Sequence, residues 1–153
     1  RALQEIQKRA SKRVEFHFYC AAKGVGLYSL ANQVKQMLDN TMVYEMTDYQ
    51  QLMGWLADAD ICLFSFPFGG TNSTIDAMLL GLPFVAYEGD EPHSRTDSTL
   101  VRRAGLPESM IAKSPAEYVT EVVRLVDEEE RRHRPRPGRT LRPDAARGGR
   151  SVA

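Results

Sequence analysis

Strand-like and helical segments alternate along the first 130 residues, and this alternation constrains the fold more than any other feature. The strand-like runs are apolar throughout or alternate with polar residues, whereas the segments between them repeat apolar residues three and four positions apart. Strands joined through helices run parallel, with helices on both faces of the sheet. We therefore expect an α/β fold with a doubly wound, Rossmann-like parallel sheet. The expected strands cover residues 14–20, 41–45, 61–65 and 83–87, and the expected helices cover residues 1–13, 27–38, 49–56, 98–104 and 115–130, with one more ending at residue 80.

Residues that favour helix ends mark several of these boundaries. Thr47 or Asp48 can cap the helix that follows them, and Gly81 stands where a left-handed residue ends a helix. Ser114 precedes Pro115 and Glu117, which is the arrangement of a capping box with proline at the first helical position. The helix at residues 1–13 has no capping residue ahead of it, so we expect the chain to be truncated at its front end.

Composition divides the chain into an expected domain at residues 1–130 and an expected disordered tail at residues 131–153. Eight of the 20 basic residues but one of the 20 acidic residues lie beyond residue 130, which leaves 12 basic against 19 acidic residues in the domain. An acidic domain gives no support for nucleic-acid binding. The tail is rich in Arg, Pro and Gly without periodicity, which is typical of disorder.

The sequence predicts neither a membrane protein nor a metal site. No apolar run approaches the ~20 residues that span a bilayer, and no signal peptide opens the chain. Cys20 and Cys62 lie in strand-like runs without metal-ligand spacing, and the three histidines are scattered. We expect two buried free thiols in a reducing compartment, and hence a cytoplasmic protein.

The stretch "FPFGGTNSTID" at residues 66–76 joins an expected strand to an expected helix, and such junctions form the ligand-binding edge of a parallel sheet. Gly69 and Gly70 allow close approach of the backbone to a ligand. Thr71, Asn72, Ser73 and Thr74 surround a helix start, where N–H groups and the helix dipole favour an anion such as a diphosphate. No lysine follows the glycines, and the dinucleotide fingerprint is absent, so the loop is neither a Walker A motif nor a Rossmann fingerprint.

Asp76 adds a second feature to this junction. It follows Asn72 by four residues, so both side chains should project from one side of the helix. A carboxylate one turn beyond a phosphate site can accept hydrogen bonds from the two hydroxyls of a ribose, and the two features together indicate a nucleotide. The residues alone leave an alternative open, in which Thr71 or Asn72 is an N-cap, Asp76 is favoured by the helix dipole, and no ligand binds.

The same junction and the segments after it resemble the C-terminal domain of family 41 glycosyltransferases over residues 3–126. This family includes the O-GlcNAc transferases and the bacterial cytoplasmic N-glycosyltransferases that modify adhesins, and the bacterial branch is the more similar. Its fold is GT-B, in which two Rossmann-like domains hold a sugar nucleotide between them. The matching positions are Phe66, Pro67, Phe68, Gly69, Thr71, Asn72 and Asp76, then Gly89, Glu91, His93 and Asp97, and then Arg103, Gly105, Leu106, Pro107 and Glu108.

The resemblance implies a role for each part of the site. Thr71 and Asn72 would contact the diphosphate of a UDP-sugar, Asp76 would bind the ribose hydroxyls, and His93 would contact the sugar or the phosphates. The base would lie along residues 46–49. The candidate donor-binding residues are Met46, Thr47, Tyr49, Gly69, Gly70, Thr71, Asn72, Ser73, Asp76 and His93.

The chain departs from the family pattern at three of these positions. Met46 stands where the bacterial enzymes have a histidine, Gly70 replaces an asparagine and Ser73 replaces a glycine. The resemblance also places the diphosphate-binding lysine, the acceptor site and most of the catalytic machinery ahead of Arg1, so we assign no catalytic residue.

We therefore expect the sugar-nucleotide-binding domain of an inverting, metal-independent glycosyltransferase. It would transfer a hexose or N-acetylhexosamine from a UDP-sugar to an Asn, Ser or Thr side chain of an acceptor protein, which binds through the missing N-terminal region. No other cofactor, no nucleic acid and no membrane is expected as a partner. Two alternatives remain open: a nucleotide-sugar-binding domain without transferase activity, and another GT-B enzyme such as an epimerase.

Four further residues have competing interpretations. His17 is expected to be a satisfied core or helix-facing residue, and Trp55 a packing or partly exposed residue. Arg95 is expected in an exposed salt bridge rather than on a phosphate. Tyr49 either covers the base or packs in the core with the apolar stripe of its helix.

Overall fold

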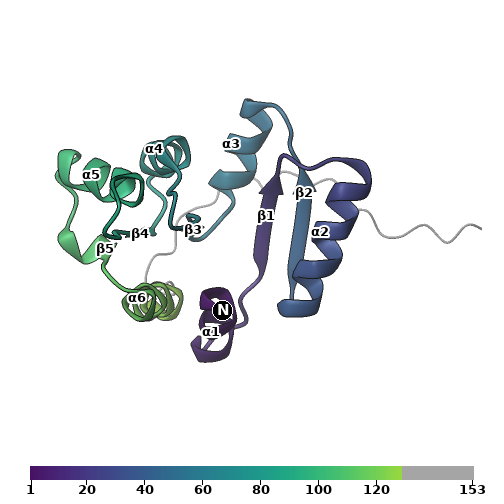
Figure 1. Cartoon of the computed structure of the whole chain (residues 1–153), viewed down its shortest axis with the longest axis horizontal. Helices are drawn as coiled ribbons and strands as arrows, with labels where there is room; N and C mark the ends of the chain where they lie inside the picture. Colours follow the sequence, from purple (N-terminus) through teal and green to yellow (C-terminus); the bar gives the residue numbers. More distant parts are fainter. Residues whose placement is uncertain (129–153) are drawn as a thin grey trace, which may run out of the picture. The chain divides into compact units, whose positions relative to one another are not determined.

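The computed structural model describes residues 1–128, in which helices and parallel strands alternate as the sequence predicts (Figure 1). These residues group into two compact units, one formed by residues 15–55 and the other by residues 1–14 together with residues 56–128. The single domain expected at residues 1–130 stays a prediction. The tail expected at residues 131–153 lies outside the described residues.

The unit at residues 15–55 consists of strand β1 (Phe16–Cys20), helix α2 (Gly24–Met37), strand β2 (Thr41–Glu45) and most of helix α3 (Tyr49–Ala57). The two strands are parallel and in continuous register along their full length, with Tyr19 opposite Tyr44. Helix α2 is the crossover and packs against β2 with Val34 buried. A right-handed strand–helix–strand unit is the connection that parallel pairing requires.

Four stacked rings form the aromatic cluster of this unit, from His17, Tyr19, Tyr44 and Trp55. The ring centroids of Tyr19 lie 5.2 Å from Tyr44 and 5.5 Å from Trp55, whose side chain is 7% exposed. His17 stacks on Tyr44, with Nδ1 3.0 Å from the tyrosine hydroxyl and Nε2 2.6 Å from the Glu15 carboxylate. The predictions that His17 is a satisfied residue and Trp55 a packing residue are both confirmed.

The structure contradicts one of the two interpretations of Tyr49 on helix α3. The apolar spacing placed Tyr49 in the core, but Tyr49 is 58% exposed, and Trp55 is the residue of this helix that is buried. The indole has more apolar area to bury than the other side chains of the helix, and its stacking on two tyrosines sets which face of α3 turns inward. The interpretation of Tyr49 as a core residue is therefore wrong, and the interpretation in which it covers the base stays a prediction.

The second unit contains a three-stranded parallel sheet in the order β3-β4-β5. Helices α4 and α5 lie on one side of this sheet and α6 on the other, and α1 packs along α6 (Figure 1). The elements are α1 (Ala2–Arg9), β3 (Cys62–Leu63), α4 (Thr71–Leu80), β4 (Phe84–Tyr87), α5 (Thr96–Arg103), β5 (Ile111–Ala112) and α6 (Pro115–Glu128), with 3-10 turns at Pro92–Ser94 and Glu108–Met110.

The strands differ from the prediction in number and length. The five strands pair in two sets rather than in one predicted sheet, and β5 was not predicted because it is only Ile111 and Ala112 between a 3-10 turn and a helix. The run expected at residues 61–65 pairs only at Cys62 and Leu63. The mixed α/β class with parallel strands is confirmed.

The predicted helix ends are confirmed by their hydrogen bonds. Gly81 ends α4 with φ 59° and ψ 33°. Asp48 caps α3 by accepting the Gln51 N–H at 2.9 Å. Ser114 Oγ accepts the Glu117 N–H at 3.1 Å, and the Glu117 carboxylate accepts the N–H of Lys113, one residue earlier than in a standard capping box.

Most of the larger unit's core lies between its sheet and helices α4, α5 and α6. Phe84 on β4 is 2% exposed and packs at 5.2 Å from Phe64, while Tyr118 of α6 is also 2% exposed. Cys62 is buried and Cys20 is half-buried, both as free thiols as predicted. Across residues 1–128, each helix is too short or too polar to cross a membrane.

Candidate functional site

The candidate site lies at the carboxyl ends of β3 and β4, within the unit that contains residues 56–128. The chain leaves β3 through a turn in which the Phe66–Pro67 peptide is cis and the Gly69 N–H donates to the Ser65 carbonyl at 3.0 Å. Gly69 has φ 67°, a left-handed conformation that side chains disfavour. The turn then enters α4 at Thr71. The predicted strand-to-helix junction is therefore present.

The first turn of α4 leaves its N-terminal N–H groups without side-chain caps. Gly70 is the N-cap residue, and within the described residues no side chain caps the helix. Thr71, Asn72 and Ser73 are all exposed and stand at the first three helical positions, whose N–H groups have no intrahelical acceptor. Thr74, the fourth polar residue expected beside the anion, is 0% exposed, so that part of the prediction is wrong. Gly70, rather than Thr71 or Asn72, is therefore the N-cap, and the binding of an anion here stays a prediction. An exposed helix N-terminus of this kind favours an anion.

Asp97, at the start of α5, fixes the glycine turn before α4 by two hydrogen bonds. Its side chain is 2% exposed; Oδ2 accepts the Gly70 N–H at 2.9 Å, and Oδ1 lies 2.9 Å from the Thr74 hydroxyl. Sequence reasoning placed Asp97 in the family pattern but gave it no role. Only its spacing after the turn was visible in the sequence, and spacing does not reveal a contact between two helix starts.

His93 lies next to the turn at residues 66–70. It belongs to the 3-10 turn after β4, and its ring stacks on Phe68 with centroids 4.8 Å apart and an interplanar angle of 23°. Both side chains are exposed, Phe68 by 72%. An imidazole and a phenyl ring therefore flank the turn that precedes α4.

Asp76 is half-buried, whereas Asn72 is exposed, so the two do not share one environment. Asp76 lies close enough to Cys62 for its charge to act on that thiol. Burial first, and the Asp76 charge second, raise the pKa of Cys62 to about 11. The carboxylate thus lies one turn along α4 on the side toward β3, and its role toward a ribose stays a prediction.

Met46, Thr47 and Tyr49 belong to the unit at residues 15–55, at the carboxyl end of β2. Met46 is 61% exposed and Tyr49 58% exposed, while Thr47 donates its hydroxyl hydrogen to the Gln51 side chain. These residues and the turn at residues 66–76 lie in separate compact units. The base-binding part of the predicted site therefore stays a prediction.

A network of charged side chains connects α5 to the end of β4, near the candidate site. The Arg102 guanidinium makes two bonds to Glu88, at 2.6 and 2.9 Å, and also contacts Glu108. Ser98 donates to Glu88 as well. The hydrogen bonds from Arg102 lower the pKa of Glu88 to about 2 and raise the pKa of Arg102. The sequence gave no signal for this network.

Arg95 does not make the predicted salt bridge. Its Nε donates to the Gly89 carbonyl at 3.1 Å, and none of the ion pairs within residues 1–128 involves it. The guanidinium instead fixes the loop that carries His93. No role on a phosphate is assigned to it.

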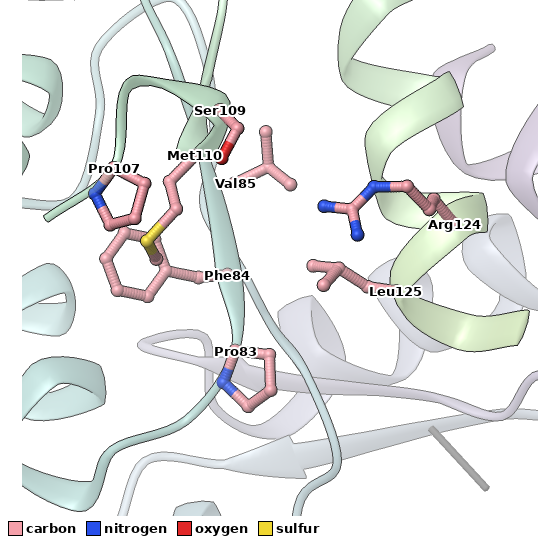
Figure 2. A pocket seen from close by; sticks show the side chains of 8 residues that line it. All are labelled: Pro83, Phe84, Val85, Pro107, Ser109, Met110, Arg124 and Leu125. Atoms are coloured by element: carbon pink, nitrogen blue, oxygen red, sulfur yellow. The ribbon is translucent and has the colours of Figure 1, made fainter. Parts of the chain in front are cut away.

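A pocket on the same unit lies away from the predicted site. Figure 2 shows Arg124 and Leu125 projecting from α6 toward β4, with Pro107 and Met110 across the strand. Pro83 and Phe84 place this pocket at the amino end of β4, whereas ligands of parallel sheets bind at the carboxyl ends. Within the described part of the chain, no group of three or more His, Cys, Asp or Glu could hold a metal ion.

No family model matches the chain. Over 133 residues, which are 86% of this chain, it is 36% identical to UDP-glucose:protein N-β-glucosyltransferase of Actinobacillus pleuropneumoniae serotype 5b, strain L20. Over 69 residues, 45% of this chain, it is 30% identical to SPINDLY of Solanum lycopersicum, named as a UDP-N-acetylglucosamine–peptide N-acetylglucosaminyltransferase. The chain spans 22% of the length of the bacterial relative and 7% of the plant one.

The fold is similar to that of a solved structure, a mutant of the O-GlcNAc transferase of Thermobaculum terrenum. The TM-score is 0.72 at 20% sequence identity, over 86% of this chain and 28% of that chain. At this identity the similarity shows the fold alone. The sequence similarities confirm the predicted resemblance to protein glycosyltransferases, and none of the three proteins is named as an epimerase.

Proposed function

We propose that this chain, a relative of the bacterial protein N-glycosyltransferases, is the donor-binding part of an inverting glycosyltransferase that works without a metal ion. The whole enzyme transfers a hexose or N-acetylhexosamine from a UDP-sugar to an Asn, Ser or Thr side chain of a protein. The fold proposed for this part is a doubly wound, Rossmann-like domain, one of the two in a GT-B enzyme. Parallel strands and helices on both sides of the β3-β4-β5 sheet support it.

The observation that carries the proposal is the uncapped N-terminus of α4. Thr71, Asn72 and Ser73 place exposed hydroxyl and amide groups beside first-turn N–H groups, in a segment that lies within the similarity to a UDP-glucose transferase. Backbone N–H groups and the helix dipole favour a diphosphate at this position. The glycine turn before it lets the phosphates approach the backbone.

The remaining donor contacts are proposed from the resemblance. Asp76, one turn along α4, accepts hydrogen bonds from the ribose hydroxyls, and His93 contacts the sugar or the phosphates from the stacked pair with Phe68. The base lies along Met46, Thr47 and Tyr49, where exposed Tyr49 offers a ring for stacking.

The chemistry that such a site supports is stabilisation of the leaving UDP. Negative charge develops on the diphosphate as the glycosidic bond breaks, and preorganised N–H and hydroxyl donors lower the energy of that charge without a metal. The acceptor protein and the catalytic base belong to parts of the whole enzyme outside this chain. We place the enzyme in the cytoplasm, with no nucleic acid or membrane as a partner.

The test is a calorimetric titration of the chain with UDP, UDP-glucose and UDP-N-acetylglucosamine. Asn72→Ala and Asp76→Ala should each weaken UDP binding about tenfold, as expected for one or two hydrogen bonds to a charged or diol ligand. Asp90→Asn is the matched control, because Asp90 is an exposed acid in the loop after β4 that makes none of the proposed contacts. No detectable UDP binding by the wild type, or equal binding by all variants, contradicts the proposal.

One observation favours a second function, a nucleotide-sugar-binding domain without transfer. Met46 stands exposed where the resemblance implies a histidine. If the loss of that imidazole has abolished transfer, Met46→His in the full-length protein restores transfer to an acceptor peptide. If the wild type already transfers the sugar, the binding-only function is excluded.

A further inference from the structure

Asp97 is the one acid whose buried carboxylate contacts the glycine-rich turn among the described residues. Both of its oxygens are used, Oδ2 by the Gly70 N–H and Oδ1 by the Thr74 hydroxyl. Thr74 itself is 0% exposed, and its hydroxyl also lies 3.1 Å from the Gly70 carbonyl. Within residues 1–128, no buried side-chain oxygen or nitrogen lacks a partner, so this small network is complete.

The position of Asp97 also explains the glycine beside it. A Cβ at Gly69 would lie 2.7 Å from Asp97 Oδ2, closer than real Cβ contacts allow. The Asp97 carboxylate therefore fills the space that a side chain at position 69 would need. The turn can pack against this carboxylate only because residue 69 is glycine. Asp97 lies in the first turn of α5, where the helix dipole stabilises its charge.

This arrangement determines which N–H groups of α4 remain for a ligand. The Gly70 N–H points to Asp97, and the Thr74 N–H closes the first intrahelical bond to the Gly70 carbonyl at 2.7 Å. The groups between them, on Thr71, Asn72 and Ser73, are the ones that face outward from the helix start. A turn anchored at Gly70 presents these three groups in one fixed geometry.

We infer that Asp97 is a positioning residue, which anchors Gly70 and Thr74 and thereby presents the first-turn N–H groups of α4 to a nucleoside diphosphate. The inference rests on the proposed function for its ligand. The inference is counterintuitive in one respect: the negative charge of Asp97 should repel an anion bound at the start of α4. If its charge dominated, removing it would strengthen UDP binding; if its hydrogen bonds dominate, removing them weakens it.

Two substitutions of Asp97 separate these effects in the full chain. Asp97→Asn removes the charge but keeps the anchor: its amide oxygen accepts the Gly70 N–H, and its NH₂ donates to the Thr74 oxygen, whose hydrogen turns to the Gly70 carbonyl. Asp97→Ala removes both. We expect Asp97→Asn to bind UDP within about threefold of wild type or more tightly, and Asp97→Ala to bind about tenfold or more weakly. Similar tightening in both variants overturns the inference.

A second pair keeps the test decisive if Asp97→Ala fails to fold. Thr74→Val has nearly the same shape but leaves Asp97 Oδ1 without its hydroxyl partner, whereas Thr74→Ser keeps the hydroxyl. The valine variant should bind UDP several-fold more weakly and the serine variant should match wild type. Equal UDP affinity in the two variants contradicts the anchor.

Hydrogen exchange at the Gly70 amide tests the anchor without any ligand. By NMR, this amide should exchange slowly in the wild type and in Asp97→Asn, and at least about tenfold faster in Asp97→Ala or Thr74→Val. An unchanged Gly70 rate in those two variants overturns the inference, whatever UDP does. A slow Gly70 amide in a wild type that binds no UDP overturns the proposed function instead and leaves the anchor established.

Discussion

Two constraints exclude a side chain at position 69, the backbone conformation and the space occupied by Asp97. The φ of Gly69, 67°, is a left-handed value, and a Cβ there would meet Asp97. Gly105 has almost the same φ, 68°, but nothing lies within 4 Å of its Cβ position. The two glycines therefore separate the cost of the conformation from the cost of the contact.

Gly105→Ala should destabilise the protein by about 1–2 kcal/mol, the cost of a left-handed alanine. Gly69→Ala should cost more, because the added methyl group also displaces Asp97 and opens the turn. Urea denaturation measures both free energies of unfolding, and UDP titration should be affected by Gly69→Ala only. Equal destabilisation by the two substitutions would mean that the turn yields to the methyl group.

The junction at the end of β4 shows how one charged side chain can link three elements that also share a hydrophobic core. Arg102 of α5 bonds Glu88, which follows β4, and Glu108 in the 3-10 turn before β5. One guanidinium thus links a strand end, a helix and a turn. Arg103, its neighbour, is exposed and offers a matched control.

Arg102→Met should lower the free energy of unfolding at neutral pH. It should also reduce the loss of that free energy as the pH falls below 4.5. Glu88 has a pKa lowered from 4.5 to about 2, so its contribution is present above pH 4.5 and is lost as the pH falls toward 2. Without Arg102 its pKa returns toward the ordinary value, and the difference from wild type should shrink over that pH interval. Urea midpoints measured across it provide the test. The urea midpoint of Arg103→Met should vary with pH as in the wild type. If the midpoint of Arg102→Met fell with pH as steeply as that of the wild type, Arg102 would not be the group that lowers the pKa of Glu88.

The sequence predicts elements well where local signals are strong and fails where tertiary contacts decide. Periodicity and caps correctly placed β2 and the ends at Gly81 and Ser114, because those signals lie within a few residues. The core interpretation of Tyr49 was wrong, because the stacking of Trp55 on rings from two strands decides which end of α3 is buried. The role of Asp97 was missed for the same reason: its partners lie 23 and 27 residues away in the chain.

At the scale of the whole molecule, the chain corresponds to 22% of the bacterial relative it matches. The proposed donor site is a complete helix start with its anchor, whereas no acceptor site or base has been assigned to the chain. Binding and transfer should therefore separate between this chain and the full-length protein.

The chain alone should bind UDP and show no transfer of sugar to an acceptor peptide, while the full-length protein should do both. Mass spectrometry of the peptide after incubation with UDP-glucose or UDP-N-acetylglucosamine measures transfer directly. Asp76→Ala in the full-length protein should reduce transfer by about tenfold at limiting donor, in line with its proposed ribose contact. Transfer by the 153-residue chain itself would show that it carries its own base and acceptor site.

The aromatic cluster gives the protein a built-in optical reporter. Trp55 is the chain's single tryptophan, and it is enclosed by tyrosines within the unit at residues 15–55. Its emission spectrum therefore follows the opening of that unit, whereas far-ultraviolet circular dichroism sums the helices of both units. Different melting temperatures in the two signals would show that the two units unfold separately. The shift that a nucleotide causes in each signal could be measured on one sample.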